Sequence, residues 1–354
     1  MSTTTPISTP ISTPISTMAR RRFVTNDGNT LSFTTMGFGS APLGNYTRVL
    51  DEDECDRTLE LAWDSGLRYF DTAPFYGFGL SEMRVGRLLR KLKREDYVIS
   101  TKVGRLFEPC AKSEVNSGFF IDTPQLRMYY DYSYDGVMRS YEESLGRLGI
   151  DNVDILYVHD ICAFVHGGRE GSERVIRELF DTGGWRALTE LRDNGDVLAI
   201  GAGVNEWQPC ARLLELADPD LFLLAGRYTL LEQDPLDKLF PQCQEQNARI
   251  VVGGPYNSGV LAGTPTYNYD TVPPDVAERV AAIGAVCADY DVPMARAALH
   301  FVAAHPVVVS VIPGGQNVEQ TRENVRLLDE PIPAAFWADL KARGLIRADA
   351  PTPE

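Results

Sequence analysis

Residues 68–89 read RYFDTAPFYGFGLSEMRVGRLL, and this run sets the architecture that we expect of the chain. Its apolar start, Tyr69-Phe70, is typical of a buried strand and ends at Asp71. A proline and two glycines then break regular structure around Tyr76. From Ser81, which can cap a helix, apolar residues follow at helical spacing. The run therefore predicts a strand, a loop and a helix, with an acid at the strand end and a phenol in the loop.

Taken alone, Asp71 and Tyr76 are also compatible with a capped turn and an ordinary loop residue. Two further apolar runs, however, end in the same manner. Residues 97–104 (YVISTKVG) place Lys102 near a strand end, and residues 155–160 (ILYVHD) place His159 at another. In a parallel barrel the carboxyl ends of the strands converge on one face. We therefore expect Asp71, Tyr76, Lys102 and His159 to form one cluster.

Strand-like and helical patterns alternate along most of the chain. The continuous apolar runs at 250–252 and 307–309 are typical of strands buried on both faces. The pairs of expected strand and helix are 36–40 with 53–65, 69–72 with 81–92, 97–103 with 135–148, 155–159 with 172–194, 198–204 with 209–217, 221–224 with 235–246, 250–253 with 274–290, and 307–312 with 318–328. This pattern predicts an α/β fold, a (β/α)8 TIM barrel over residues 23–345, with a doubly wound open sheet as the alternative.

The two ends of the chain differ from this pattern. Residues 1–22 repeat PIST and lack an apolar core, which predicts a disordered low-complexity tail, with a transit peptide as the alternative. Residues 23–33 contain the turn sequence NDGN and predict a β-hairpin that plugs the bottom of the barrel. Residues 346–354 are expected to form a C-terminal tail.

Composition limits the classes of partner. The formal charge of −15 and the pI near 4.8 argue against binding to nucleic acid or to an anionic membrane. No apolar run approaches the roughly 20 residues that cross a bilayer. The six cysteines show neither C-x-x-C pairs nor zinc-like spacing, so we expect free thiols in a reducing cytosol and no metal. The expected partner is therefore a small-molecule substrate.

The four clustered residues suggest proton transfer. A tyrosine has a reference pKa of about 10, so it needs a nearby cation to become a useful base near neutrality. Lys102 would supply that cation, and Asp71 would hold the lysine in place. His159 would hydrogen-bond the reacting oxygen.

These residues resemble the tetrad of the aldo-keto reductases, which runs Asp, Tyr, Lys, His in chain order. The resemblance spans about residues 33–328 through FDTAPFYG with SEMRVGRLL, STKVG, LYVHD and VIPGGQNVEQTREN. The runs GFGSAPLGN, DYSYDGVMRSYEESLGRLGIDNVDILYVHD and GAGVNEW are most similar to the branch that oxidises aldoses.

The resemblance implies NAD(P)-dependent hydride transfer from C1 of an aldose of the L-fucose, D-threo-aldose or L-galactose type, giving a lactone. Two alternatives stay open. One is a pyridoxal 4-dehydrogenase or another aldehyde/alcohol oxidoreductase of the family. The other is a nucleotide-binding regulatory subunit with little turnover.

The cofactor is expected at the later strands. No G-x-G-x-x-G follows an early strand, whereas Gly314 and Gly315 lead from the last strand into a helix whose N-terminus can hold a phosphate. In the family, Lys, Ser and Arg bind the 2′-phosphate of NADP, and the resemblance maps Gly314, Gly315 and Gln320 to these positions. We therefore expect NAD in preference to NADP, with Arg322 as the alternative contact if the alignment shifts by one helical turn.

The remaining cofactor contacts also come from the resemblance. Glu323 and Asn324 align with residues that contact adenine. Asn205 matches the family asparagine that holds the nicotinamide amide, although Val204 and Ala225 replace its usual partners. The position of the stacking aromatic maps to Gly253, with Pro255 and Tyr256 close by. Asn205 is alternatively a cap of the helix that starts near Pro209.

Residues 105–135 form an unusually long connection that is rich in aromatic side chains. Loops of this length are usually functional or disordered, and aromatic residues argue against disorder. We predict that this insertion walls the substrate pocket, with a packed surface excursion as the alternative. The Gly-rich residues 163–173 are a second candidate for the rim.

Overall fold

A computed structural model describes residues 18–353 and contains a closed parallel barrel. Parallel bridges from Met36 to Val311 and from Gly39 to Gly314 join its first and last strands. This arrangement confirms the predicted (β/α)8 barrel. The strands, in spatial order, are β3 (Phe38–Gly39), β4 (Tyr69–Asp71), β5 (Val98–Val103), β8 (Ile155–His159), β9 (Ala199–Val204), β10 (Leu221–Ala225), β11 (Arg249–Gly253) and β14 (Val308–Ile312).

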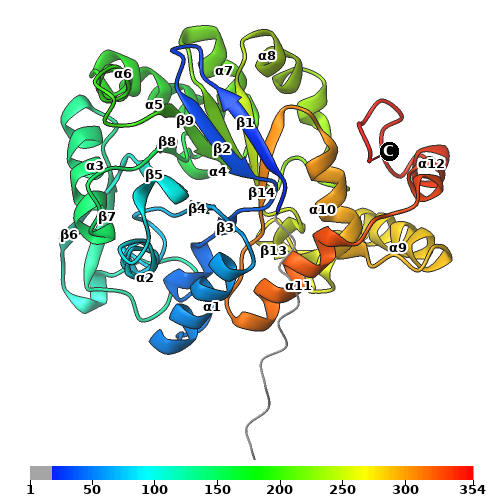
Figure 1. The fold of residues 1–354 in the computed structure, drawn as a ribbon. Coiled ribbons are helices and arrows are strands. Elements are labelled where there is room, and N and C mark those ends of the chain that lie inside the picture. Colours follow the sequence, from blue (N-terminus) through cyan, green and yellow to red (C-terminus); the bar gives the residue numbers. More distant parts are fainter. Residues whose placement is uncertain (1–17, 354) are drawn as a thin grey trace, which may run out of the picture.

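Helices surround the barrel (Figure 1). They are α1 (Glu52–Asp64), α2 (Leu80–Leu89), α3 (Tyr134–Leu148), α4 (Ala163–His166), α5 (Arg169–Asp181), α6 (Gly184–Asp193), α7 (Gln208–Leu216), α8 (Leu239–Glu245), α9 (Pro274–Asp289), α10 (Met294–Ala304), α11 (Val318–Asp329) and α12 (Ala334–Ala342). The single helix predicted over 172–194 is wrong, because Gly183, with φ of 82°, separates α5 from α6. Helices α10 and α12 were not predicted.

An N-terminal hairpin closes one end of the barrel. Strand β1 (Arg20–Val24) pairs antiparallel with β2 (Thr30–Thr34), and Figure 1 shows the pair crossing the strands of the barrel. Phe23, Leu31 and Phe33 pack in one buried cluster with the first residues of several barrel strands, Tyr69, Val98, Ile155, Ala199 and Leu221. The predicted plug is thus confirmed, and the carboxyl ends of the strands form the opposite face.

Both predicted tails need correction. Arg20 to Arg22 belong to β1 rather than to a disordered segment, and the prediction for residues 1–17 lies outside the described residues. At the other end, Ile346 and Ala350 are buried in the main core, and the Arg347 N–H donates to Gln233 Oε1 at 2.8 Å. Residues 346–353 therefore pack as part of the barrel domain.

Two hairpins extend from the carboxyl face. The 105–135 insertion contains β6 (Arg105–Pro109), paired antiparallel with β7 (Leu126–Tyr130). The connection after β11 contains β12 (Thr266–Tyr267), paired with β13 (Asp270–Thr271), which was not predicted. In the described residues all six cysteines are free thiols, as expected, and no helix is long and apolar enough to cross a membrane.

Candidate active site

An ion pair forms the base of the site. Asp71 ends β4 and Lys102 lies near the end of β5, and the Lys102 ammonium donates to Asp71 Oδ2 at 2.7 Å and to the Thr72 carbonyl at 2.9 Å. Both side chains are almost fully buried. Gly203 on β9 makes room for the lysine, because a Cβ there would lie 3.0 Å from Lys102 Cε. The pair is therefore fixed in position by packing as well as by charge.

Tyr76 lies above this pair in the loop between β4 and α2. The loop is held by Gly77, which has φ of +68° and packs so tightly on Gly44 that a Cβ would lie 2.3 Å from the Gly44 oxygen. The Tyr76 ring centroid is 4.6 Å from Lys102 Nζ and 5.9 Å from the His159 ring. The structure thus brings the four predicted residues into one cluster.

The expected cap of α2 is wrong. The helix begins at Leu80 after Gly79, with no side-chain cap. The Ser81 hydroxyl instead donates to the Ser40 carbonyl at 2.8 Å, while Ser40 Oγ donates to the Asp71 carbonyl at 2.6 Å. Ser81 therefore ties the start of α2 to the ends of β3 and β4.

The electrostatics of the phenol differ from the expectation. Burial, with the carboxylates of Asp71 and Asp160, raises the pKa of Tyr76 well above its ordinary value, and only Arg105 opposes this. Because Asp71 lies directly against Lys102, the ammonium meets the phenol as half of an ion pair rather than as an isolated cation. Burial and the cations of Arg105 and Lys102 lower the pKa of His159 well below its ordinary value. Both rings are consequently neutral near pH 7.

Sequence reasoning missed two charged residues beside the cluster. Asp160 Oδ2 accepts a hydrogen bond from Arg105 Nη2 and lies 3.3 Å from His159 Nε2. Asp160 Oδ1 accepts from Asn205 Nδ2 at 3.0 Å. Asn205 therefore does not cap α7, whose N-cap is Trp207. Their places in the sequence could have indicated them, because Asp160 directly follows His159 and Arg105 follows the strand that carries Lys102.

A cavity of about 300 Å³ opens beside His159. Its wall includes Phe119 and Phe120 from the 105–135 insertion, and Phe164 and Val165 from α4, within the Gly-rich 163–173 segment. The other main lining residues are Tyr46, Phe75, Tyr76, Lys102, Arg105, Asp160, Asn205 and Tyr269. The cavity thus has aromatic walls and a polar end at the cluster.

A second cavity of about 380 Å³ adjoins the first, and Tyr76 and Tyr269 line both. Five predicted cofactor residues line it: Gly253, Pro255, Tyr256, Gly314 and Gln320. Further glycines in its wall, Gly39, Gly254 and Gly259, leave backbone groups open to a ligand. No Lys or Arg is among its described lining residues. These features fit an extended dinucleotide whose phosphates meet backbone and neutral groups.

Three other predicted cofactor residues lie outside the wall of this cavity. Gly315 is buried, and a Cβ there would lie 2.5 Å from Thr321 Oγ1. Asn324 accepts from the Tyr256 hydroxyl at 2.7 Å and donates to the Gly314 carbonyl at 3.3 Å, so it holds two lining residues. Glu323 is exposed and pairs with Arg326 at 2.7 Å.

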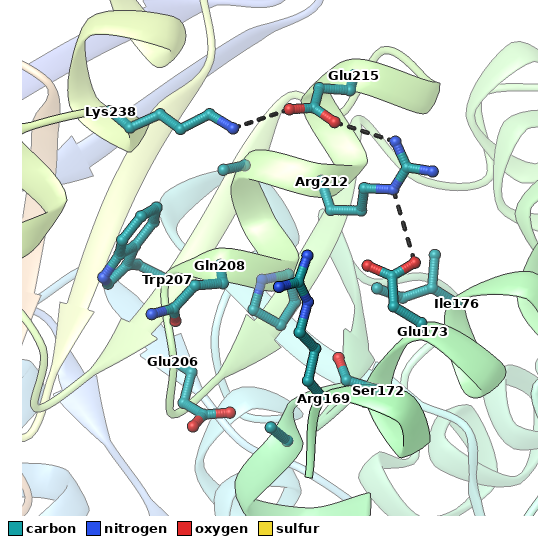
Figure 2. A pocket seen from close by; sticks show the side chains of 13 residues that line it. Arg169, Ser172, Glu173, Ile176, Glu206, Trp207, Gln208, Arg212, Glu215 and Lys238 are labelled. Atoms are coloured by element: carbon teal, nitrogen blue, oxygen red, sulfur yellow. Dashed lines mark hydrogen bonds and ion pairs between the residues drawn. The ribbon is translucent and has the colours of Figure 1, made fainter.

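A third hollow, of about 520 Å³, lies outside the barrel between α5 and α7 (Figure 2). Figure 2 shows four of its charged side chains joined in a row: Lys238 with Glu215 at 2.9 Å, Glu215 with Arg212 at 3.0 Å, and Arg212 with Glu173 at 3.8 Å. These charges are already paired, and none of the predicted site residues lines this hollow. The two cavities at the carboxyl face remain the candidate site.

Comparisons with known proteins place the chain among oxidoreductases. The chain is 42% identical over 330 residues to pyridoxal 4-dehydrogenase of Microbacterium luteolum, covering 89% of this chain and 95% of that protein. It is 37% identical over 333 residues to D-threo-aldose 1-dehydrogenase of a Pseudomonas species, covering 91% and 96%. The holo form of an aldo-keto reductase from Bacillus halodurans, AKR11C1, superposes with a TM-score of 0.72 at 25% identity, covering 94% and 98%.

The barrel, its carboxyl-face cavities and these relatives define an NAD(P)-dependent oxidoreductase that binds a nicotinamide cofactor. The model of the aldo/keto reductase family matches residues 35–343. The chain belongs to the aldo/keto reductase family.

Proposed function

We propose that this protein oxidises the C1 carbinol of a cyclic aldose to a lactone, with NAD as the preferred acceptor. The supporting observation is the position of the cluster at the junction of two cavities. Tyr76 lines both cavities, Asp71 lines the glycine-rich cavity and His159 lines the aromatic one. A cofactor in the first and a sugar in the second would therefore meet at the phenol.

Different residues of the chain would bind the cofactor, orient the substrate and accept its proton. A bound nicotinamide supplies the hydride chemistry. The glycine-rich wall at Gly253 and Gly314 and the Asn205 amide would hold the cofactor. The neutral His159 imidazole would hydrogen-bond the carbinol oxygen, and Tyr76, after loss of its own hydroxyl proton to solvent, would take the carbinol proton. Tyr76 lines both cavities, so its side chain borders the spaces assigned here to the cofactor and to the sugar.

Pyridoxal is the second candidate substrate, and the aromatic wall favours it. Its aldehyde and neighbouring hydroxymethyl group close into a cyclic hemiacetal, so oxidation at that carbon also gives a lactone. Phe119 and Phe120 can stack on a flat ring, and the relative from Microbacterium luteolum carries this substrate in its name. The two candidates share one reaction at a hemiacetal carbon.

One screen tests the proposal and separates the candidates. Purified protein is supplied with NAD and L-fucose, L-galactose, pyridoxal or a simple primary alcohol, and NADH formation is followed by absorbance. We expect kcat/KM to be highest for a cyclic hemiacetal. Activity confined to the simple alcohol would refute the lactone-forming reaction.

The preference for NAD rests on the charge of the cavity wall. A 2′-phosphate needs charge-assisted hydrogen bonds, and no Lys or Arg is among the described residues lining this cavity. Arg322 is exposed and does not line it. We expect a higher kcat/KM with NAD than with NADP, and the reverse order would contradict this. The free thiols agree with a cytosolic location, which we also propose.

A further inference from the structure

The polar end of the aromatic cavity holds a buried ion pair that the reaction scheme above leaves unused. Arg105 and Asp160 are both nearly inaccessible, with side chains 5% and 8% exposed. Both line the cavity beside His159. A buried ion pair is weak evidence for stability, because desolvation can cancel the attraction between its charges. Its place at the reaction site therefore calls for a functional explanation.

We propose that Arg105 binds a substrate oxygen beside the hemiacetal carbon, and that Asp160 positions His159 and Asn205 around it. This inference rests on the proposed function and deepens it. Arg105 becomes a residue that determines specificity, whereas Asp160 acts through its neighbours. The substrate class is a cyclic hemiacetal with an adjacent hydroxyl or phenolate oxygen.

Arg105 lines the cavity and retains unused hydrogen-bonding capacity. A guanidinium has five N–H donors, yet within residues 18–353 Asp160 is the only side-chain or backbone acceptor that Arg105 meets. Its buried Nε has no partner. Phe75 supports the guanidinium plane, with Cζ 4.0 Å from the ring centroid. Buried donors are usually paired, so this fixed cation is suited to an oxygen of a bound substrate.

Lys102 is a poor alternative for this task. Its ammonium already donates to Asp71 and to the Thr72 carbonyl, as described above. Arg105 is therefore the cation in the described lining that has most donors left. An aldose offers the hydroxyl next to C1, and pyridoxal offers the phenol oxygen next to its aldehyde-bearing carbon. Either oxygen can accept from a planar guanidinium.

Asp160 connects residues that follow three different strands. Its carboxylate meets Arg105 after β5, His159 at the end of β8 and Asn205 after β9. Its backbone has φ of +52°, which is uncommon for a residue other than glycine, and its N–H donates to the Gly203 carbonyl at 2.9 Å. Such backbone is held by its surroundings and often occurs at functional sites. Asp160 thereby sets His159 relative to Asn205, and both residues line the aromatic cavity.

The two charges act on the phenol in opposite directions. The charged and titratable groups near Tyr76 are Asp71, Lys102, Arg105, His159, Asp160 and Tyr269. Asp160 raises the pKa of Tyr76 and Arg105 lowers it. Removing the Arg105 charge should therefore move the alkaline limb of the pH–rate profile to higher pH, and removing the Asp160 charge should move it to lower pH.

The test compares Arg105→Met, Asp160→Asn and the double variant with the parent chain, using NAD and the best hemiacetal found in the screen. We expect Arg105→Met to raise KM about tenfold to a hundredfold, since a hydrogen bond to a charged group is lost. A simple alcohol without the adjacent oxygen should show little change. Asp160→Asn should lower kcat more than it raises KM.

The pH profiles supply the second reading. The alkaline limb of the pH–rate profile should move to higher pH in Arg105→Met and to lower pH in Asp160→Asn. In the double variant it should return toward its position in the parent chain. The control variants are Arg127→Met and Glu108→Gln, which break an exposed ion pair on the same β6–β7 hairpin. They should change neither KM nor the pH–rate profile. Thermal unfolding and NADH binding check that each variant is folded.

The outcomes separate this inference from the proposed function. If the parent oxidises no hemiacetal, the proposed function fails. If the parent is active but Arg105→Met keeps its KM, or if both limbs move in the same direction, Arg105 and Asp160 do not have the assigned roles. A KM increase that is equal for hemiacetals and for simple alcohols would also overturn the binding of an adjacent oxygen.

Discussion

The Nζ atom of Lys102 lies 4.6 Å from the centroid of the Tyr76 ring, and Asp71 accepts a hydrogen bond from the same nitrogen at 2.7 Å. The phenol therefore lies next to an ammonium group that is already paired with a carboxylate. A neutral phenol is a competent proton donor, and it becomes a base only when its proton is lost. This geometry leads to expectations for two measurements on Tyr76.

Tyr76→Phe should lower kcat by at least 10²-fold, because general acid–base groups typically contribute factors of 10² to 10⁴. The ring still fills its place between Phe120 and His159, so NADH binding should be unchanged. Steady-state kinetics and fluorescence titration measure the two quantities. Retained turnover would show that another group carries the proton.

The pH dependence follows from the pKa of Tyr76, which lies well above its ordinary value. Near pH 7 the phenol is protonated, so only a small fraction is ready to accept a proton. For oxidation, kcat/KM should therefore rise about tenfold per pH unit from neutral into alkaline solution. For the reverse reduction it should stay level over the same range. A level profile for oxidation would contradict Tyr76 as the base.

Gly77→Ala should disturb the loop that carries Tyr76. The new Cβ would lie 2.3 Å from the Gly44 oxygen at a backbone φ of +68°. We expect a loss of about 1 to 3 kcal/mol in the free energy of unfolding, together with a lower kcat. Gly28→Ala is the matched control, since Gly28 also has positive φ but has no atom within 4 Å of its Cβ position. Equal effects at the two sites would point to backbone strain alone.

The sequence predicted the barrel and the cluster because both depend on local patterns. Asp71 and His159 each end an apolar run, Lys102 lies one residue before the end of its strand, and the parallel barrel brings such ends together. The helical break at Gly183 was missed because apolar spacing continues on both sides of it. The helix α12 was missed because its first half is almost wholly apolar and lacks a clear polar face.

The Arg105–Asp160 pair was missed for a different reason. These residues are 55 positions apart, and nothing local shows that they meet. Tyr269 is a similar case, since its hydroxyl reaches Asn205 Oδ1 at 3.2 Å from the turn of the β12–β13 hairpin. Contacts of this kind depend on how loops fold over the barrel mouth, and the spacing of residues within a loop does not encode them.

Gln320→Arg should raise kcat/KM for NADP about tenfold, while the value for NAD should change little. Gln320 lines the glycine-rich cavity, and its side chain accepts from the Gln316 N–H at 2.9 Å. A guanidinium there can form charge-assisted hydrogen bonds with a 2′-phosphate, which NAD lacks. Arg322→Gln is the control, because Arg322 is exposed and outside the cavity wall. If Arg322→Gln lowers the efficiency with NADP instead, then Arg322 is the residue that meets the phosphate, and the assignment of Gln320 to that position is wrong.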